Sequence, residues 1–474
     1  MRLPLLILGP ALVAALAYAV RHRAMRLALL VLASTLHLAV AGSLWAWPSP
    51  AAWGGWLAAD APGLLVLTLV SVLFLVTSIY AVGFLRTEPP RGGRVFVSGL
   101  LGFLAAASLV ALSHHLALLW VGMETTTLAL APLVYHRHDR RSLEAVWKYL
   151  LLSSVGIALA LLGTFFLAAA QGAGSPLMLE ALVSGKAGLE PILLRTAFVF
   201  MLAGYGTKMG LAPLHAWKPD TYGEAPSLVA GLMAGGLTSC AFLGVARITQ
   251  VAIAGGQADF VRPVLLTMGM ISLVVAAAFM IGQVDLKRLL AYSSVEHMGL
   301  LVLGLGLGGV GPYGTELHLV NNALTKGVMF LAVGNVVLAT GSSSSEAAGS
   351  ILRRLPVTGV LLLGGLFAVT GSPPFGLFRS EFTILQAAIA EGHPIIALAL
   401  VALLAVIFIG IGSAMLDVLY RPRGEDAPVV RESPLLVAGP LVLLLAALVL
   451  GLYVPRFLHL RLVEAAVGLG GVAP

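Results

Sequence analysis

Residues 205–220 read YGTKMGLAPLHAWKPD, and they fall in an apolar stretch that extends from about residue 192 to 215. Lys208 stands just before Gly210 and Pro213 in this stretch. Proline removes a backbone donor and clashes with the preceding turn, so a helix is expected to break here. In lipid, the backbone groups freed at a break need protein or water as partners. The sequence therefore predicts a membrane helix that is broken next to a lysine.

A second break of the same kind lies in the stretch 357–390, which contains Gly371, Ser372, Pro373 and Pro374. Paired broken helices in corresponding positions indicate internal repeats in transport proteins. The two breaks are five spans apart, and five is an odd number, so the second unit would be inverted. We expect N-terminal helices 1–3 over 1–94, a first repeat of helices 4–8 over 95–250, a second, inverted repeat of helices 9–13 over 262–420, and helix 14 over 433–474.

The composition indicates an integral membrane protein. Of the 474 residues, 59% are hydrophobic and 10% are charged, whereas about 25% are charged in a typical soluble domain. At roughly 20 residues per span, the apolar stretches predict an all-α polytopic protein with about 14 transmembrane helices. Cys240 is the single cysteine, which excludes a disulfide scaffold and argues against an iron–sulfur centre. We predict no cofactor and no metal site in this chain.

Basic residues gather in every second predicted loop. These loops lie around 21–26, 86–94, 137–148, 218, 287–288, 353–354 and 421–431, and they include Arg91, Lys218 and Arg423. The positive-inside rule places these loops in the cytoplasm, so both termini are expected on the opposite side. Membrane topology accounts for the net charge of +7 without nucleic acid.

A few ionisable residues fall inside the predicted spans, where such groups are costly and are functional candidates. They are Glu124, Lys208, Glu296, His297, Lys326, Arg379 and Glu381. Five of the spans carry one near the middle of the bilayer, which favours a row running along the membrane plane. Arg379 could instead anchor a helix near an interface, Glu296 could face a loop or a partner, and the other charges could be structural.

Polar neighbours support a hydrated row. His318, Asn322 and Lys326 recur every four residues and share one helix face, beside Thr325. Ser293 lies one turn before His297. A lysine next to a carboxylate keeps its proton and releases it when that charge moves, so Glu124 and Lys208 are a candidate switch pair.

At these residues the chain resembles the antiporter-like proton-channel subunits of complex I, multisubunit Na⁺/H⁺ antiporters and energy-converting hydrogenases. The resemblance rests on Lys208 followed by Pro213, His215, Trp217, Pro219 and Asp220, on the stretch 285–299, on Lys326 and on the stretch 373–382. The sequence ETTTL at 124–128 followed by Trp147 resembles most the hydrogenase-4 and formate hydrogenlyase type.

The resemblance implies two inverted repeats with helices 7 and 12 broken. It also implies a proton pathway through Glu124, Lys208, His297, Lys326 and Glu381, with His215 as a possible member. Two positions depart from the family pattern: Ser239 replaces a lysine of many relatives, and Asn322 replaces a histidine. Ser239 can hold water but not a proton at neutral pH.

We therefore expect a proton-translocating, or Na⁺-translocating, subunit of a hydrogenase-type or complex-I-like oxidoreductase. Its partners would be other membrane subunits and, indirectly, a peripheral redox arm, in a prokaryotic cytoplasmic membrane. Three alternatives stay open: a non-conducting scaffold, which Ser239 and Asn322 favour, a stand-alone transporter, and a subunit coupled to a non-redox partner such as an inorganic-carbon-uptake protein.

Overall fold

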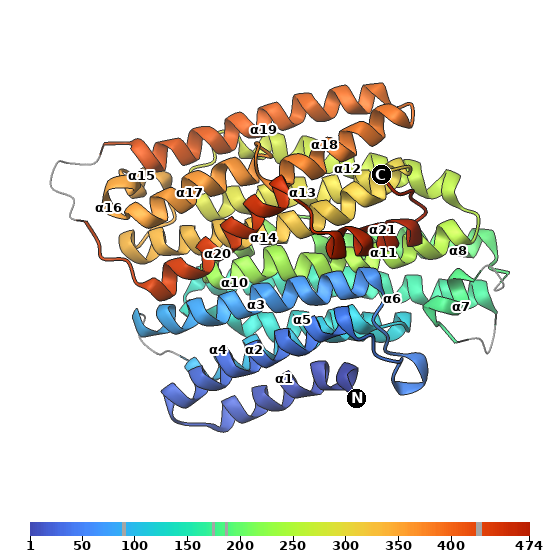
Figure 1. The fold of residues 1–474 in the computed structure, drawn as a ribbon, viewed down its shortest axis with the longest axis horizontal. Coiled ribbons are helices and arrows are strands. Elements are labelled where there is room, and N and C mark those ends of the chain that lie inside the picture. The colour runs from blue at the N-terminus through green and yellow to red at the C-terminus, as the bar shows by residue number, and fades with distance from the viewer. Residues whose placement is uncertain (88–91, 173–175, 185–187, 423–428) are drawn as a thin grey trace.

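The structure is a computed structural model that describes residues 1–87, 92–172, 176–184, 188–422 and 429–474. Over these residues it is built from helices joined by short turns, as predicted (Figure 1). The long unbroken helices are α1 (Arg2–Ala19), α2 (Arg23–Ala46), α3 (Ala61–Thr87), α4 (Gly93–Leu112), α5 (Leu116–Val134), α6 (Arg140–Gln171), α12 (Ala258–Met280), α13 (Leu286–Leu307), α14 (Gly311–Thr340), α19 (Pro394–Tyr420) and α20 (Pro434–Leu452).

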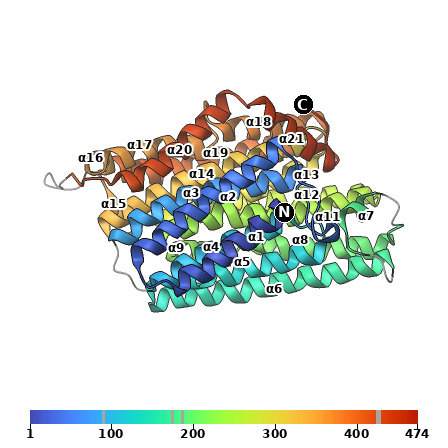
Figure 2. The same cartoon turned by 60° about the horizontal axis from the view of Figure 1, so that its bottom comes forward.

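The helices lie side by side, with α1 at one edge and α19 at the other (Figure 1). Viewed from below, α6 forms a further edge (Figure 2). The helix α13 lies in the centre, and every residue of its apolar window is buried. A central helix without a lipid-facing side can carry polar groups on all its faces, provided that they find partners.

Within the described residues, twelve helices are long and apolar enough to cross a membrane. The remaining two of the fourteen expected spans are those with the predicted breaks. At the first break the chain is divided into α8 (Pro191–Met209) and α9 (Trp217–Glu224), and at the second into α17 (Pro356–Val369) and α18 (Gly376–Ala390). The exact number of spans and the inverted relation of the repeats stay predictions.

The first break begins where Gly210 ends α8 with φ +83°. Only glycine adopts this left-handed conformation without strain. A methyl group at Gly210 would also lie 2.6 Å from Cδ of Lys218. At the second break Gly371 has φ +60°, and a methyl group there would overlap the carboxylate of Glu381. Each break thus brings an ionisable side chain against a glycine.

A third irregularity was not predicted. The eighth span consists of α10 (Ser227–Leu232), the π-helical turn η3 (Met233–Leu237) and α11 (Thr238–Ala254). Such π turns occur often at functional sites. The hydroxyl of Ser239 donates a 2.5 Å hydrogen bond to the carbonyl of Gly235 in this turn.

The topology prediction needs correction at two lysines. Both were expected in cytoplasmic loops, but Lys218 lies in α9, Lys287 lies in α13, and both are buried. The chain turns back into the protein after the break, and a charge count along the sequence cannot detect this. Two other residues of the predicted basic loops, Arg91 and Arg423, lie outside the described residues.

Shorter elements lie toward the ends of the bundle: the helices α7 (Leu179–Val183), α15 (Ser345–Ala348) and α16 (Ile351–Arg354), with the turns η1 (Trp53–Gly55) and η2 (Tyr135–Arg137). The terminal α21 (Arg456–Gly468) packs against α14 and α3. Both termini lie nearer to the end that holds α7 than to the end with α15 and α16 (Figure 1).

Candidate functional site: a buried row of charged residues

The first group of the row lies where α5, α6 and α8 meet. The ammonium of Lys208 is fully buried and donates a hydrogen bond to the hydroxyl of Thr127. That hydroxyl lies 3.3 Å from Oε2 of Glu124. Lys208 also lies 5.2 Å from the centre of the Tyr149 ring, which is a cation–π distance. Thr127 therefore stands between the two members of the predicted switch pair.

A second group lies between α13 and α14, where the ammonium of Lys326 donates a 2.6 Å hydrogen bond to the hydroxyl of Ser293. Lys326 is fully buried. Glu296, on the same face of α13 as Ser293, is the carboxylate whose negative charge favours the ammonium of Lys326. Glu296 is 1% exposed, so it faces neither a loop nor a partner subunit. Asn322 is buried, and neither its amide nitrogen nor its oxygen has a hydrogen-bond partner among the described residues.

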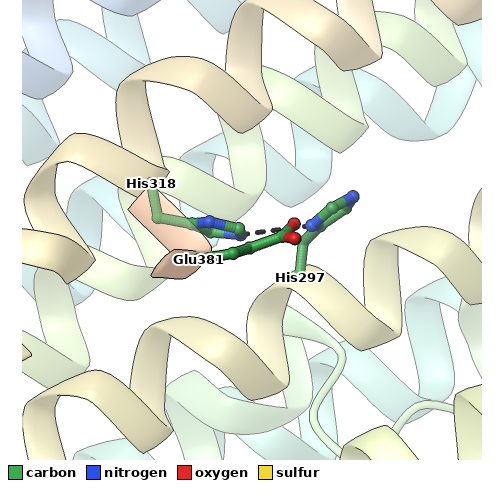
Figure 3. Close-up of side chains that lie close together, drawn as sticks. All are labelled: His297, His318 and Glu381. Atoms are coloured by element: carbon green, nitrogen blue, oxygen red, sulfur yellow. Dashed lines mark hydrogen bonds between the residues drawn. The ribbon is translucent and has the colours of Figure 1, made fainter. Parts of the chain in front are cut away.

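The third group joins α13, α14 and α18 (Figure 3). His297 Nδ1 and His318 Nε2 lie 3.1 Å apart, and His318 Nδ1 lies 3.0 Å from the hydroxyl of Ser380. One ligand atom each of His297, His318 and Glu381 falls within 4.8 Å of the others. Three such atoms could hold a metal ion, but the short contact between the two imidazoles also suits direct proton exchange.

The remaining sequence candidates lie beside the row or away from it. Thr325 is buried next to Lys326, and His215 is half-buried in the first break, with its ring centre 6.3 Å from that of Tyr292. Pro213, Pro373 and Pro374 are exposed at the breaks. Arg379 is exposed on α18, so it is not part of the buried row.

A charged cluster that the sequence analysis missed lies at the end of the bundle that holds α7. The guanidinium of Arg247 is 1% exposed and donates to both carboxylate oxygens of Asp60, at 2.5 and 2.6 Å. His114 Nε2 lies 3.7 Å from Asp60 Oδ2. Glu316 at the start of α14 is buried near this pair, and neither of its oxygens has a hydrogen-bond partner among the described residues. Nothing in the sequence spacing connects residues 60, 114, 247 and 316.

The titration of this cluster is set by burial and by Arg247. Burial alone would raise the pKa of the Asp60 carboxyl, but the Arg247 guanidinium outweighs it and holds that pKa below its ordinary value. Burial lowers the pKa of His114 below its ordinary 6.5, although Asp60 opposes the shift. The cluster therefore favours an ionised Asp60 beside a neutral His114 at pH 7.

Comparison with known proteins identifies the family of the chain. A family model described as "NADH:quinone oxidoreductase/Mrp antiporter, TM" matches residues 113–407. The hydrogenase-4 component F homolog of Methylacidiphilum infernorum (isolate V4) is 32% identical over 429 residues, which cover 87% of this chain and 85% of that protein. The NADH-quinone oxidoreductase subunit N of Desulforudis audaxviator (strain MP104C) is 34% identical over 346 residues, or 72% of this chain and 67% of that one.

Among solved structures, a chain of the membrane-bound sulfane sulfur reductase, an archaeal respiratory membrane complex, superposes with a TM-score of 0.90 at 22% identity. The match covers 99% of this chain and 98% of that chain, and it supports the fold. The chain belongs to the NADH:quinone oxidoreductase/Mrp antiporter family. It is an antiporter-like integral membrane subunit of the type found in complex I and hydrogenase-type complexes.

Proposed function

We propose that this chain translocates protons across the membrane as a non-redox subunit of a hydrogenase-type or complex-I-like assembly. The support is a set of fully buried ionisable groups on separate helices, each hydrogen-bonded to a hydroxyl or an imidazole: Lys208 to Thr127, Lys326 to Ser293 and His297 to His318. Buried charges weaken a fold unless they are well paired. Their repetition on three separate helices is better explained by ion movement than by stability.

The proposed mechanism begins at the Glu124 carboxylate, which stabilises the proton on Lys208 through Thr127. When the charge on Glu124 is neutralised, the Lys208 ammonium loses that support and passes a proton onward. The proton then reaches Lys326, crosses His318 and His297, and leaves near Glu381. The trigger would arrive from neighbouring membrane subunits, because no cofactor-binding motif is found in the sequence.

We also propose that the basic loops face the cytoplasm and that both termini lie on the opposite side. The excess of lysine and arginine in alternate loops supports this orientation. The position of both termini toward one end of the bundle is consistent with it (Figure 1).

The test is ion translocation by vesicles that carry the intact complex, with Lys208→Ala compared to the wild type. We expect translocation per turnover to fall by about tenfold or more, while native gels show full assembly and electron transfer continues. A matched control is Lys148→Ala, because Lys148 is 43% exposed on α6 and pairs with Asp220.

Unchanged translocation in an assembled Lys208→Ala complex would favour the scaffold instead, the reading that Ser239 and Asn322 support. Replacing Na⁺ by K⁺ in the assay separates the two ions: a proton route keeps its rate, whereas a Na⁺ route stops.

A further inference from the structure

Lys218 is one of the buried charges that the proposed pathway does not use. It lies in the first turn of α9 and is fully buried. Its ammonium donates a 2.7 Å hydrogen bond to the carbonyl of Met209, which the break in α8 leaves free. No carboxylate forms an ion pair with it in the part of the chain that the structure describes. A buried ammonium held only by carbonyls is costly and needs an explanation.

Lys218 lies between the group around Lys208 and the group around Lys326. On one side, the ring of Trp217 contacts those of Tyr149 and Tyr222, with ring centres 5.2 and 6.0 Å away. Lys208 lies over the first tyrosine ring and Lys218 over the second, at 5.2 and 5.8 Å. The two lysines thus face the same aromatic group from two sides.

On its other side Lys218 approaches the group around Lys326. Its ammonium lies 3.5 Å from the carbonyl of Ser294 on α13. The neighbouring Ser293 accepts the hydrogen bond of Lys326. The positive charge of Lys326 repels the positive charge of Lys218, and both lysines disfavour a positive charge on His297. Lys218 therefore interacts electrostatically with Lys326 and His297.

The surroundings of Lys218 also offer places for water. The buried hydroxyls of Tyr149, Tyr222 and Ser294 form no well-aligned hydrogen bond among the described residues, although Tyr222 lies close to Ser294 and Tyr149 close to Thr127. Buried polar atoms of this kind commonly bind ordered water. Ser239, by contrast, donates its hydroxyl proton to Gly235 within its own helix, and it cannot carry a positive charge.

We infer that Lys218 carries the proton between Lys208 and Lys326, in the place of the lysine that many relatives have at the position of Ser239. This inference rests on the proposed function. In each transfer the Lys218 ammonium first releases one proton toward Lys326 and becomes a neutral amine. The amine then accepts a proton that originates from the Lys208 ammonium and returns to the ammonium, so no charge is gained or lost over the cycle.

The decisive variant is Lys218→Arg, tested for proton translocation in vesicles with the intact complex. Arginine keeps the positive charge and can still donate to Met209, but its guanidinium does not release a proton in proteins. We expect translocation per assembled complex to fall by about tenfold or more. A purely structural lysine would instead be replaced by arginine with little loss, and wild-type translocation by Lys218→Arg would overturn the inference.

Two further variants distinguish a loss of proton transfer from a packing defect. Lys287→Met removes another fully buried lysine, whose ammonium donates a 2.9 Å hydrogen bond to the carbonyl of Ala225, and it should keep its translocation per assembled complex. The double variant Lys218→Met with Ser239→Lys restores the lysine of the relatives, and it should recover translocation that Lys218→Met alone lacks. A structural role at Lys218 gives no reason for that rescue.

The result for Lys208→Ala in the same vesicles separates the two proposals. If Lys208→Ala stops translocation and Lys218→Arg does not, the pathway stands and the role of Lys218 is wrong. If neither variant lowers translocation, the proposed function itself fails.

Discussion

Arg247 and Asp60 form a two-pronged ion pair, in which the guanidinium of a buried arginine donates to both oxygens of a carboxylate that is 30% exposed. The pair ties the middle of α11 to the residue just before α3, and the two are far apart in the sequence. Because water reaches only one partner, the loss of one partner is not equivalent to the loss of the other.

The first prediction follows from this asymmetry. Asp60→Asn leaves a buried guanidinium without its countercharge, and we expect it to lower the free energy of unfolding by on the order of 3 kcal/mol. Arg247→Met leaves a carboxylate that water can still solvate, so its effect should be smaller. Thermal unfolding of the purified complex compares the two variants. Equal losses, or a larger loss for Arg247→Met, would contradict this account of the pair.

The second prediction concerns Thr127, whose hydroxyl stands between Lys208 and Glu124. Thr127→Val keeps the shape of the side chain and removes the hydroxyl. A hydrogen bond to a charged group contributes about 1.5–3 kcal/mol, so we expect proton translocation to fall by roughly tenfold or more.

Thr126→Val is the matched control, because Thr126 is equally buried on α5 and donates only to the carbonyl of Met123. Its translocation should equal that of the wild type in the same vesicle assay. If both valine variants behave alike, Thr127 does not connect the pair.

The third prediction concerns two asparagines of α14 with opposite surroundings. Asn322 has no hydrogen-bond partner among the described residues, which suits a side chain that binds water in the row. Asn335 is bonded to Tyr80, Thr358 and Leu436. We expect Asn322→Leu to reduce translocation severalfold with normal assembly, and Asn322→His, the residue of many relatives, to retain it.

Asn335→Leu should show the reverse behaviour, with a lower melting temperature and normal translocation in the complexes that assemble. Both readouts come from one preparation of each variant. A normal rate for Asn322→Leu would remove Asn322 from the proton route.

The sequence predicts the fold well because its signals are local. Apolar runs of span length give the helices, and Gly210 with Pro213, and Gly371 with the two prolines, give the breaks. Buried candidates such as Lys208 and Lys326 follow from the cost of charge in lipid. The π turn next to Ser239 leaves no comparable mark, since its residues are as apolar as those of an ordinary span.

Contacts between distant segments could not be predicted. The hydroxyl of Thr127 lies between two residues that the sequence analysis paired directly, and only the packing of α5 and α8 against α6 reveals it. Lys218 was assigned to a loop because it follows a break, whereas α9 carries it back into the protein. His318 and Glu381 meet because α14 packs on α18, and Arg379, two residues from Glu381, points outward.

The last prediction is a pH dependence of stability at the Asp60 cluster. Burial lowers the pKa of His114 below 6.5, with Asp60, Arg247 and Glu180 as the charges around it. The folded chain thus binds this proton more weakly than the unfolded chain, so stability is lost as the pH falls below 6.5. Protonation of Asp60, whose pKa is held low by Arg247 against the effect of burial, adds to the loss at still lower pH.

Melting temperatures of the complex at pH 7.5 and pH 5.5 test the contribution of His114. His114→Gln should show a smaller drop on acidification than the wild type, because glutamine has no proton to gain. His138→Gln, at an exposed side chain on the cytoplasmic side of the proposed topology, should drop as the wild type does. If His114→Gln loses as much stability in acid as the wild type, another group is responsible for the acid sensitivity, and His114 stays neutral throughout that range.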